Sequence, residues 1–151
     1  MKNTEIRFAN EEDVALILDF IKDLAEYEKM SDFVVADEAL LREWIFEKKK
    51  AEVIFALEDG KEVGFALFFH NFSTFLGRAG IYLEDLFVIP EYRGKGYGAS
   101  NVTAMTEYYL SLGYNVAYTC RNDNKASIAL AARCGYKQIA ETYYFICYKE
   151  E

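Results

Sequence analysis

The sequence predicts a single α+β domain over residues 1–151, built on a mixed, mostly antiparallel central sheet of about six to seven strands flanked by about four helices. The first observation is the order of the elements: a strand, two helices, an antiparallel meander, then helix, strand, helix and two strands. The second is that no repeat or Pro/Gly/Ser-rich linker divides the 151 residues, a length that suits one core. The third is a hydrophobic content of 52%, which favours a packed core over disorder.

The first third of the chain predicts a strand and a capped helix. Residues 4–8 alternate between polar and apolar side chains, as a half-buried strand does. Asn10 followed by Asp13 predicts an N-terminal cap. The helix after it carries an apolar stripe at helical spacing, made of Val14, Ile17, Leu18, Ile21, Leu24 and Ala25.

A second helix is predicted to begin at Asp37, which has the side chain of a good N-cap. Lys48, Lys49 and Lys50 are expected to end it, since cations favour the negative end of a helix dipole. The side chains expected to face inward are Leu40, Leu41, Trp44 and Ile45.

The middle of the chain predicts an antiparallel meander. A short apolar strand over 53–57 leads into Asp59-Gly60, a strong hairpin turn. A return strand over 62–69 and a third long strand over 80–88 follow. After a glycine-containing loop, a helix carries Val102, Met105, Tyr109 and Leu112 and stops at Gly113. The last expected elements are a strand over 116–120, a helix over 125–134 ending at Gly135, and strands over 136–140 and 142–148.

Composition and charge exclude several classes of function. The net charge of −8 disfavours nucleic acid and favours cationic ligands, although an acidic surface also serves solubility alone. No apolar run approaches the ~20 residues that span a bilayer, and no secretory signal is evident, so we expect a cytoplasmic protein without a membrane partner. His70 is the only histidine, and Cys120, Cys134 and Cys147 fit no zinc spacing. We therefore expect no metal and no His-based triad, with ordinary reduced cysteines.

The segment from Arg93 to Gly98 is the most informative stretch, because it follows a strand and opens a helix. Its glycines let backbone N–H groups approach an anion, and the helix N-terminus adds a positive dipole end. Arg93 and Lys95 add full charges. We therefore expect a pyrophosphate site, the alternative being a glycine-rich turn with no ligand.

Three known phosphate-loop patterns are candidates for this segment. A P-loop requires Ser or Thr after the lysine, but Gly96 follows Lys95. The dinucleotide fingerprint fits Gly94, Gly96 and Ala99, yet an antiparallel meander precedes the loop where that fold has a βαβ unit. The third pattern, Arg-x-x-Gly-x-Gly at Arg93, Gly96 and Gly98, resembles the coenzyme A pyrophosphate loop of the GNAT superfamily of N-acetyltransferases.

The resemblance covers essentially the whole chain. It rests on Arg7-Phe8-Ala9, Asp13, residues 21–28, residues 82–88 running into Tyr92-Arg93-Gly94, and the motif of Asn124, Ser127 and Ile128. In these segments the chain resembles the polyamine (spermidine/spermine) and thialysine N-acetyltransferases. The resemblance implies a GNAT-like fold and acetyl-CoA as the cosubstrate. It also implies a pantetheine arm along the backbone of Leu86, Phe87 and Val88, and Asn124 near the thiol end. The residues that it implies for the pyrophosphate are Arg93, Gly94, Lys95, Gly96, Tyr97, Gly98 and Ala99.

Glu84 and Asp85 are the candidates for acid–base chemistry. Strand alternation predicts that they point to opposite faces of the sheet. A protonated alkyl amine, with a pKa of about 10, must lose a proton before it attacks a thioester, and a carboxylate can accept that proton. The resemblance assigns this catalytic role to Glu84; the alternative is an acidic pair that forms a salt bridge or faces solvent.

The expected substrate-binding residues are Tyr27, Glu28, Glu84 and Asp85. For Tyr27 and Glu28, which match amine-site residues of the resembling branch, the alternative is the solvated end of the first helix. The aromatic segment over 68–75 is either a wall for an alkyl chain or core plus a loop.

Two departures from the family pattern stand out. The tyrosine that acts as general acid in the family corresponds to Ala131, preceded by Leu130, and Cys134, Tyr136 and Tyr143 lie near in sequence without an assignable role. Losing a general acid costs about 10²–10⁴ in rate without abolishing catalysis. An acidic residue and a tryptophan that help to bind polyamine correspond to Ser73 and Phe75, which puts polyamine itself in question.

The leading hypothesis is an enzyme that transfers an acetyl group from acetyl-CoA to a primary amine of a small cationic acceptor by direct attack. Such acceptors are polyamines, diamines and lysine- or thialysine-like molecules. The alternatives are a coenzyme A-binding module with weak or lost catalysis that acts through a protein partner, and an N-acetyltransferase for proteins or peptides. Family analogy suggests a homodimer.

Overall fold

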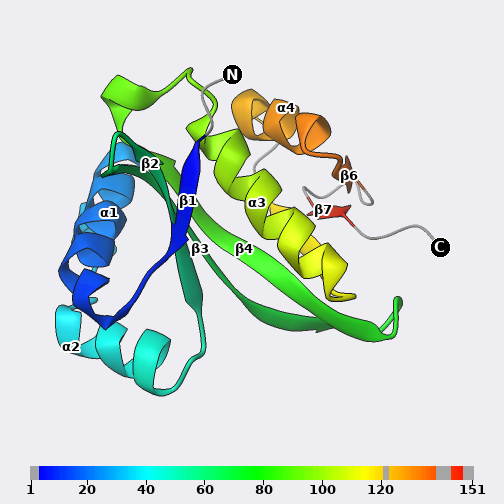
Figure 1. The fold of residues 1–151 in the computed structure, drawn as a ribbon, viewed down its shortest axis with the longest axis horizontal. Helices are drawn as coiled ribbons and strands as arrows, with labels where there is room; N and C mark the ends of the chain where they lie inside the picture. The colour runs from blue at the N-terminus through cyan, green and yellow to red at the C-terminus, as the bar shows by residue number, and fades with distance from the viewer. Residues whose placement is uncertain (1–3, 121–122, 139–143, 148–151) are drawn as a thin grey trace.

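A computed structural model describes residues 4–120, 123–138 and 144–147, the last of these by their backbone alone. The described strands form one sheet in the order β1-β2-β3-β4-β5-β7-β6, in which only β4 and β5 pair in parallel (Figure 1). The α+β class with a mostly antiparallel sheet is therefore confirmed. β1 to β5 form the body of the sheet and β6 and β7 are short, so the expected strand count is only approximate. The strands are β1 (Glu5–Phe8), β2 (Glu52–Glu58), β3 (Lys61–Ser73), β4 (Arg78–Val88), β5 (Asn115–Thr119), β6 (Lys137–Gln138) and β7 (Tyr144–Cys147).

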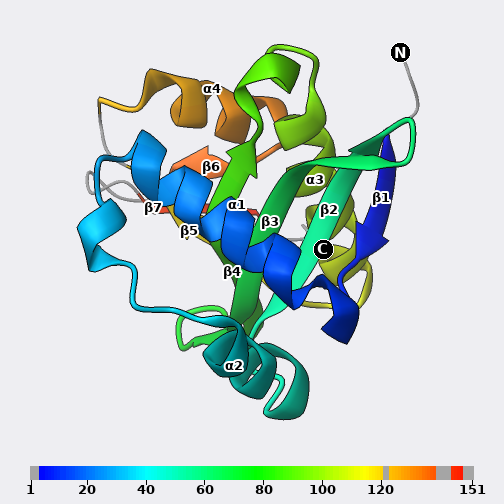
Figure 2. The same ribbon diagram turned by 90° about the vertical axis from the view of Figure 1, so that its left-hand side faces the viewer.

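Helices cover both faces of this sheet. Figures 1 and 2 show α1 lying across one face near α2, while α3 and α4 lie on the other. The four α-helices of the described residues are α1 (Val14–Tyr27), α2 (Glu38–Leu41), α3 (Tyr97–Ser111) and α4 (Lys125–Arg133). None of the helices in this described part is long and apolar enough to cross a membrane.

The two faces of the sheet form two hydrophobic cores, because strand residues alternate between them. Phe20 of α1 stacks on Phe65 of β3, with ring centroids 5.0 Å apart, and packs beside Phe55. On the other face, Met105 of α3 packs in a cluster with Ile81 of β4. Each fully buried side chain of this size contributes about 1.5–3 kcal/mol, so the cores hold β4 rigidly between α1 and α3.

Local signals in the sequence produce the expected boundaries. Asn10 and Asp13 form a reciprocal capping box before α1, and Asp37 accepts a hydrogen bond from the backbone of Leu40. Asp59 and Gly60 have φ values of 50° and 78°, the left-handed geometry of a tight hairpin turn. These predictions are confirmed.

The expectation that Leu40 and Trp44 face inward is wrong. Leu40 is 41% exposed and Trp44 is 48% exposed, whereas Ile45 is buried and Leu41 is half-buried. The chain over Arg42–Glu47 is a π-helix, which adds a residue to the turn. That extra residue rotates the apolar face away from the positions that a 3.6-residue period predicts.

A bulge in β4 sets the direction of the site residues. Leu67 pairs with Asp85, and the next residue of β3, Phe68, pairs with Leu83, so Glu84 is an extra residue in β4. Beyond the bulge, the alternation of β4 is shifted by one position. Leu83 and Leu86, three residues apart, consequently pack on the same face.

At the C-terminus, only parts of the two expected strands are described. β6 falls within the expected strand over 136–140, and β7 within that over 142–148. The remaining positions of both expected strands, including Tyr143, lie outside the described residues.

Gly80, where β3, β4 and β5 pair, is expected to tolerate no side chain. A Cβ there would lie 2.4 Å from the amide nitrogen of Asn115, which is 1% exposed, and 2.5 Å from the amide oxygen of Asn71. We expect Gly80→Ala to lower the free energy of unfolding by about 1–3 kcal/mol, measured by urea denaturation. The exposed neighbour Ala79 offers a control, since Ala79→Ser is expected to change the free energy of unfolding by less than about 0.5 kcal/mol. Equal stabilities of the two variants would contradict this packing.

Candidate active site

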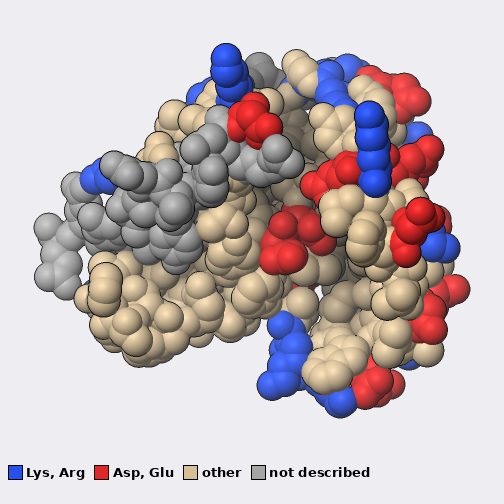
Figure 3. All heavy atoms as spheres, turned by 180° about the vertical axis from the view of Figure 1, so that it is seen from behind, with Lys and Arg blue, Asp and Glu red and all other residues tan. Residues whose placement is uncertain are grey.

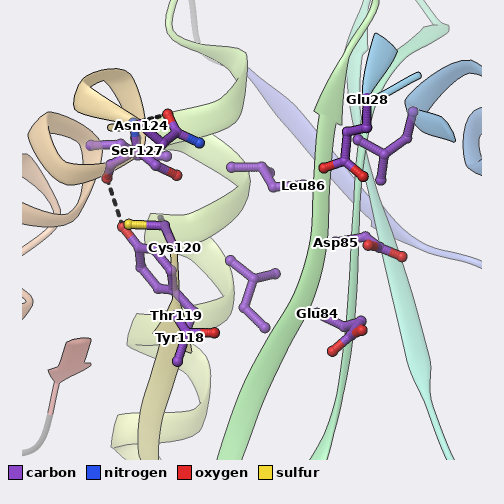
Figure 4. Close-up of a pocket in the computed structure, with 12 residues that line it drawn as sticks. Glu28, Glu84, Asp85, Leu86, Tyr118, Thr119, Cys120, Asn124 and Ser127 are labelled. Atoms are coloured by element: carbon purple, nitrogen blue, oxygen red, sulfur yellow. Dashed lines mark hydrogen bonds between the residues drawn. The ribbon is translucent and has the colours of Figure 1, made fainter. Parts of the chain in front are cut away.

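Two adjoining pockets form one groove, which begins where β4 and β5 of the sheet separate. The central pocket, about 430 Å³, lies between the end of α1, β4, β5 and the start of α4 (Figure 4). The loop pocket, about 330 Å³, lies between α4 and the turn before α3. Because Asn124, Ser127 and Leu130 line both pockets, one elongated ligand can occupy the two together.

The groove exists because β4 and β5 separate. Within the described residues, their pairing runs from Gly80 and Asn115 only to Tyr82 and Ala117. Beyond that point, residues 83–86 of β4 line one side of the central pocket, and the end of β5 with the following Cys120 lines the opposite side. A strand that has lost its neighbour presents backbone donors and acceptors, which an extended amide-containing ligand can pair with.

The backbone of β4 divides its polar groups between β3 and the groove. The N–H of Ile89 donates to the carbonyl of Val63, which makes these two a hydrogen-bonded pair. In an antiparallel ladder such pairs alternate, so the polar groups of Phe87 point toward β3. Those of Leu86 and Val88 point toward the groove. Of the three residues expected beside pantetheine, the backbone of Leu86 and Val88 therefore faces the groove and that of Phe87 does not.

The turn before α3 presents unpaired backbone amides. Gly94 and Gly96 have φ values of 77° and 90°, which favour glycine. Within the described residues, no side chain caps α3. The first amides of a helix have no partner within it, so those of Tyr97, Gly98 and Ala99 remain open to an anion.

Gly98 shows that the turn leaves room for a ligand. A Cβ on Gly98 would meet only Val88 at 3.6 Å and Leu86 at 3.8 Å, both ordinary contact distances. The protein fold itself therefore does not require glycine there. The position lines the loop pocket, where glycine lets a diphosphate approach the backbone closely. The turn thus fits the diphosphate of acetyl-CoA.

The two basic side chains of the turn are held by other parts of the protein, and of the two only Arg93 also lines the loop pocket. The Nε of Arg93 donates to the carbonyl of Val88 at 2.9 Å, and its guanidinium lies 4.5 Å from the ring centre of Tyr27. Lys95 lies 3.5 Å from the carboxylate of Glu58. Arg93 therefore ties the turn to the end of α1, and the backbone carries more of the anion site than expected.

Sequence reasoning missed Arg133, the basic side chain that α4 brings to the loop pocket. Its place depends on how α4 packs, and no local motif marks it. Sequence reasoning also left out Leu24, Tyr118 and Cys120 of the central pocket. Burial raises the pKa of the Cys120 thiol, which disfavours the nucleophilic thiolate and favours direct attack of an amine over a cysteine-linked route.

Three carboxylates, those of Glu28, Glu84 and Asp85, line the other end of the groove. The prediction that Glu84 and Asp85 face opposite sides is wrong: both leave β4 on the same side, toward the end of α1, whereas Leu86 points across the groove (Figure 4). The bulge at Glu84 is the cause, because it breaks the alternation between them. Seen from behind, acidic side chains also gather around a central hollow of the surface (Figure 3).

Asp85 is a carboxylate of the central pocket whose pKa this arrangement raises. Burial, and then the charges of Glu84 and Glu28, raise the pKa of Asp85 from 3.8 to about 6. A carboxylate held in this way gains from a bound cation, which removes the repulsion. The acidic end of the groove therefore favours a positively charged ligand.

The remaining candidate residues occupy different places. Asn124 caps α4 by accepting from the N–H of Ser127, with its amide nitrogen turned toward the groove (Figure 4). Tyr27 is 66% exposed beneath Arg93, next to the pocket residue Glu28. Phe68 belongs to the core, whereas Phe72 and Phe75 are exposed, so this segment is core plus a hairpin. Ala131 of α4 is 0% exposed and packs in the hydrophobic core between the sheet and α3.

Within residues 4–120, 123–138 and 144–147, no group of three or more His, Cys, Asp or Glu side chains is placed to hold a metal ion. Cys120 and Cys134 are free thiols. The side chain of Cys147 is outside the description. The groove thus offers backbone amides with Arg93 and Arg133 at one end and carboxylates at the other, with strand backbone between them.

Comparison with known proteins agrees with this arrangement. Residues 18–136 match the model of the Acetyltransferase (GNAT) family. The chain is 35% identical to a thialysine N-epsilon-acetyltransferase of Bos taurus, over 97% of this chain and 91% of that protein. It is 42% identical to an L-ornithine N5-acetyltransferase of Arabidopsis thaliana over 38% of this chain and 25% of that protein.

Solved structures share the fold. An aminoglycoside acetyltransferase from an uncultured soil metagenomic sample superposes with a TM-score of 0.76 at 20% identity, covering 93% of this chain and 95% of that one. At this identity the likeness concerns the fold alone. The family match over residues 18–136 and the identity to the Bos taurus protein reach further: the chain belongs to the GNAT family of acetyltransferases and is an N-acetyltransferase.

Proposed function

We propose that this enzyme acetylates a primary amine of a small cationic acceptor of the lysine, thialysine or ornithine type, with acetyl-CoA as the donor. The observation that carries the proposal is the polarity of the groove. Three carboxylates line one end, and the amides of the α3 N-terminus with Arg133 line the other. One end suits an ammonium group and the other a diphosphate.

The anion end and the backbone of β4 would hold the donor. The amides of Tyr97, Gly98 and Ala99 would bind the diphosphate, with Arg133 adding charge. The backbone of Leu86 and the N–H of Val88 would pair with the amides of the pantetheine arm, as strands pair, while the carbonyl of Val88 accepts from Arg93. When bound, acetyl-CoA supplies an activated acetyl thioester, and these contacts would direct its arm along β4 toward the end of the groove that Glu84 lines.

The carboxylates would act on the acceptor. Asp85 and Glu28 would attract the ammonium form, and Glu84, which is more exposed than Asp85, would take its proton directly or through water. The neutral amine nitrogen then attacks the acetyl carbonyl carbon, and the carbon–sulfur bond breaks. Because cation binding relieves the repulsion among the three carboxylates, the site discriminates in favour of charged amines.

The named relatives support the acceptor class and leave the individual acceptor open. These relatives are named for thialysine and ornithine, both of which carry a primary amine on a short chain. Polyamines stay a weaker candidate, since Ser73 and Phe75 lie in the exposed hairpin where the sequence departs from the polyamine pattern. The expected homodimer and the cytoplasmic location stay predictions.

The direct test is a panel of amines with acetyl-CoA, followed by release of the coenzyme A thiol. We expect turnover with thialysine, lysine and ornithine, and little with a neutral amine or a basic peptide. Glu84→Gln is expected to lower kcat by about 10²–10⁴. Glu107→Gln, on the exposed side of α3, serves as the control and should retain full activity. Tight coenzyme A binding without turnover on any amine would contradict the proposal.

Gly98→Ala separates the fold from the anion site. We expect the variant to fold with unchanged or slightly higher stability, because alanine favours a helix by about 0.5–1 kcal/mol over glycine. Its Cβ would keep the diphosphate from the amides and raise the Kd for coenzyme A at least about 10-fold. Calorimetric titration measures the Kd, and Ser100→Ala in the same turn is the control. An unchanged Kd in Gly98→Ala would place the diphosphate elsewhere.

Asp85 is expected to make folding and acceptor binding depend on pH in opposite ways. Since its folded pKa is raised, the folded protein keeps a proton between about pH 4 and 6 that the unfolded chain has lost. The free energy of unfolding therefore falls as the pH rises through this window. Asp85→Asn should remove this pH dependence and raise the free energy of unfolding at pH 7.5 by about 1–3 kcal/mol. Urea denaturation at pH 4.5 and 7.5 measures both, with the exposed Asp32→Asn as control.

Acceptor binding provides the second readout for Asp85. The wild-type KM for the amine should rise as the pH falls below about 6, because the protonated carboxyl no longer attracts an ammonium group. In Asp85→Asn the KM should be high at every pH. A variant that is neither more stable at pH 7.5 nor weaker in acceptor binding would remove Asp85 from the acceptor site.

A further inference from the structure

The groove contains a phenol that the mechanism above does not use. Tyr118 of β5 lines the central pocket on the wall opposite Leu83 and Glu84 of β4. Its side chain is largely enclosed, at 4% exposed, and packs against the ring of Tyr136. Figure 4 shows its ring rising along β5 toward the start of α4, on the side of the pocket that Leu86 faces.

The hydroxyl of Tyr118 ends at the first turn of α4. It donates a hydrogen bond of 2.9 Å to the carbonyl of Ser127. In an α-helix that carbonyl also accepts from the N–H four residues on, which is Ala131. The hydroxyl therefore lies beside the turn that carries Ala131, whose methyl group is 0% exposed and offers no polar atom.

Acetyl transfer creates a charge that this wall can meet. When the carbon–sulfur bond breaks, the electron pair moves to sulfur, which leaves as a thiolate. The acidic residues of the pocket, Glu28, Glu84 and Asp85, would repel that charge and cannot stabilise it when ionised. A neutral hydrogen-bond donor on the opposite wall would lower the energy of the transition state.

Three other side chains that could donate a hydrogen bond, those of Tyr136, Cys134 and Thr119, are engaged with other groups. The hydroxyl of Tyr136 forms a hydrogen bond of 2.6 Å with Thr106 of α3, and Tyr136 does not line the central pocket. Cys134 accepts a hydrogen bond from Thr103, also on α3, and is not a pocket residue. In the pocket itself, the hydroxyl of Thr119 pairs with that of Tyr82, at the end of the paired strands.

We propose that Tyr118 is a catalytic residue that donates a hydrogen bond to the departing sulfur of coenzyme A. The proposal rests on the proposed acetyl transfer. In that step the hydroxyl turns its hydrogen from the Ser127 carbonyl to sulfur as the carbon–sulfur bond breaks. Glu84 passes the ammonium proton to solvent, the second proton that the attacking nitrogen loses as the amide forms goes to Glu84 or water, and the thiolate takes a proton from solvent after release.

Tyr118 keeps its own proton in this role. Burial raises the pKa of its phenol, so the hydroxyl stays protonated across the working pH range. A thiol has a pKa of about 8.5, so transfer of the phenol proton to the thiolate is uphill. Donation of a hydrogen bond, in contrast, needs no transfer and is strengthened where water is excluded.

The test compares Tyr118→Phe with the wild type on acetyl-CoA and on its selenoester analogue, using thialysine as acceptor and single-turnover rates. Removing the hydroxyl while keeping the ring should lower the rate with acetyl-CoA about 10- to 100-fold, with little change in KM for acetyl-CoA. A selenolate leaves more readily and needs less help, so the defect should shrink to less than about threefold with the selenoester. Tyr136→Phe, which removes the neighbouring buried hydroxyl, should match the wild type.

Each outcome decides the proposal. An unchanged rate in Tyr118→Phe overturns it, and so does an equal defect with both donors, because a purely structural role would affect both alike. Tyr118→3-fluorotyrosine, which keeps the hydroxyl, should retain the wild-type rate and shows whether a loss in Tyr118→Phe reflects folding. A wild-type protein that releases no coenzyme A with any amine overturns the proposed function and this inference together. Wild-type turnover with an intact Tyr118→Phe variant overturns this inference alone.

Discussion

The separation of β4 from β5 beyond Tyr82 and Ala117 is the constraint on which the rest of the site depends. A sheet that stayed paired here would satisfy its backbone internally and have no groove. Because the strands diverge, Leu86 and Val88 turn backbone groups toward a space that α4 covers from one side. The two cores fix this arrangement, since β4 is packed against α1 on one face and α3 on the other.

The bulge at Glu84 adds the chemistry to this opening. Without it, Glu84 and Asp85 would alternate, and only one of them would reach the pocket. With it, both carboxylates join Glu28 at one end of the groove. Burial, together with the repulsion among these carboxylates, raises the pKa of Asp85. A bound cation offsets this repulsion. At the other end of the groove, the uncapped backbone amides of α3 play the corresponding part, because an anion is the ligand that satisfies them.

Features with a local cause could be predicted from the sequence, and those set by packing could not. The capping box at Asn10, the Asp59-Gly60 turn and the glycine turn before α3 each follow from residues a few positions apart. The bulge in β4 depends on register with β3, so the direction of Glu84 was missed. The π-helix over Arg42–Glu47 similarly changed which side chains face inward.

The candidate site divides in the same way. The segments that form the two ends of the groove were found from motifs, since the turn and the acidic pair are continuous in the sequence. Arg133 and Tyr118 enter the groove from α4 and β5, and no motif marks either of them. The side chain of Arg93 lies over the ring of Tyr27, so its direction depends on where α1 ends. The sequence of the loop contains no information about that position.

Amide hydrogen exchange with and without coenzyme A tests the central claim that the opened edge of β4 and the N-terminus of α3 hold the donor. The alternation of β4 supplies an internal reference, because the N–H of Phe87 is already bonded to β3 and those of Leu86 and Val88 face the groove. On addition of coenzyme A, we expect exchange to slow at Leu86, Val88, Gly98 and Ala99 while that of Phe87 stays slow throughout. Unchanged exchange at these amides under saturating coenzyme A, or new protection confined to another face, would contradict the account.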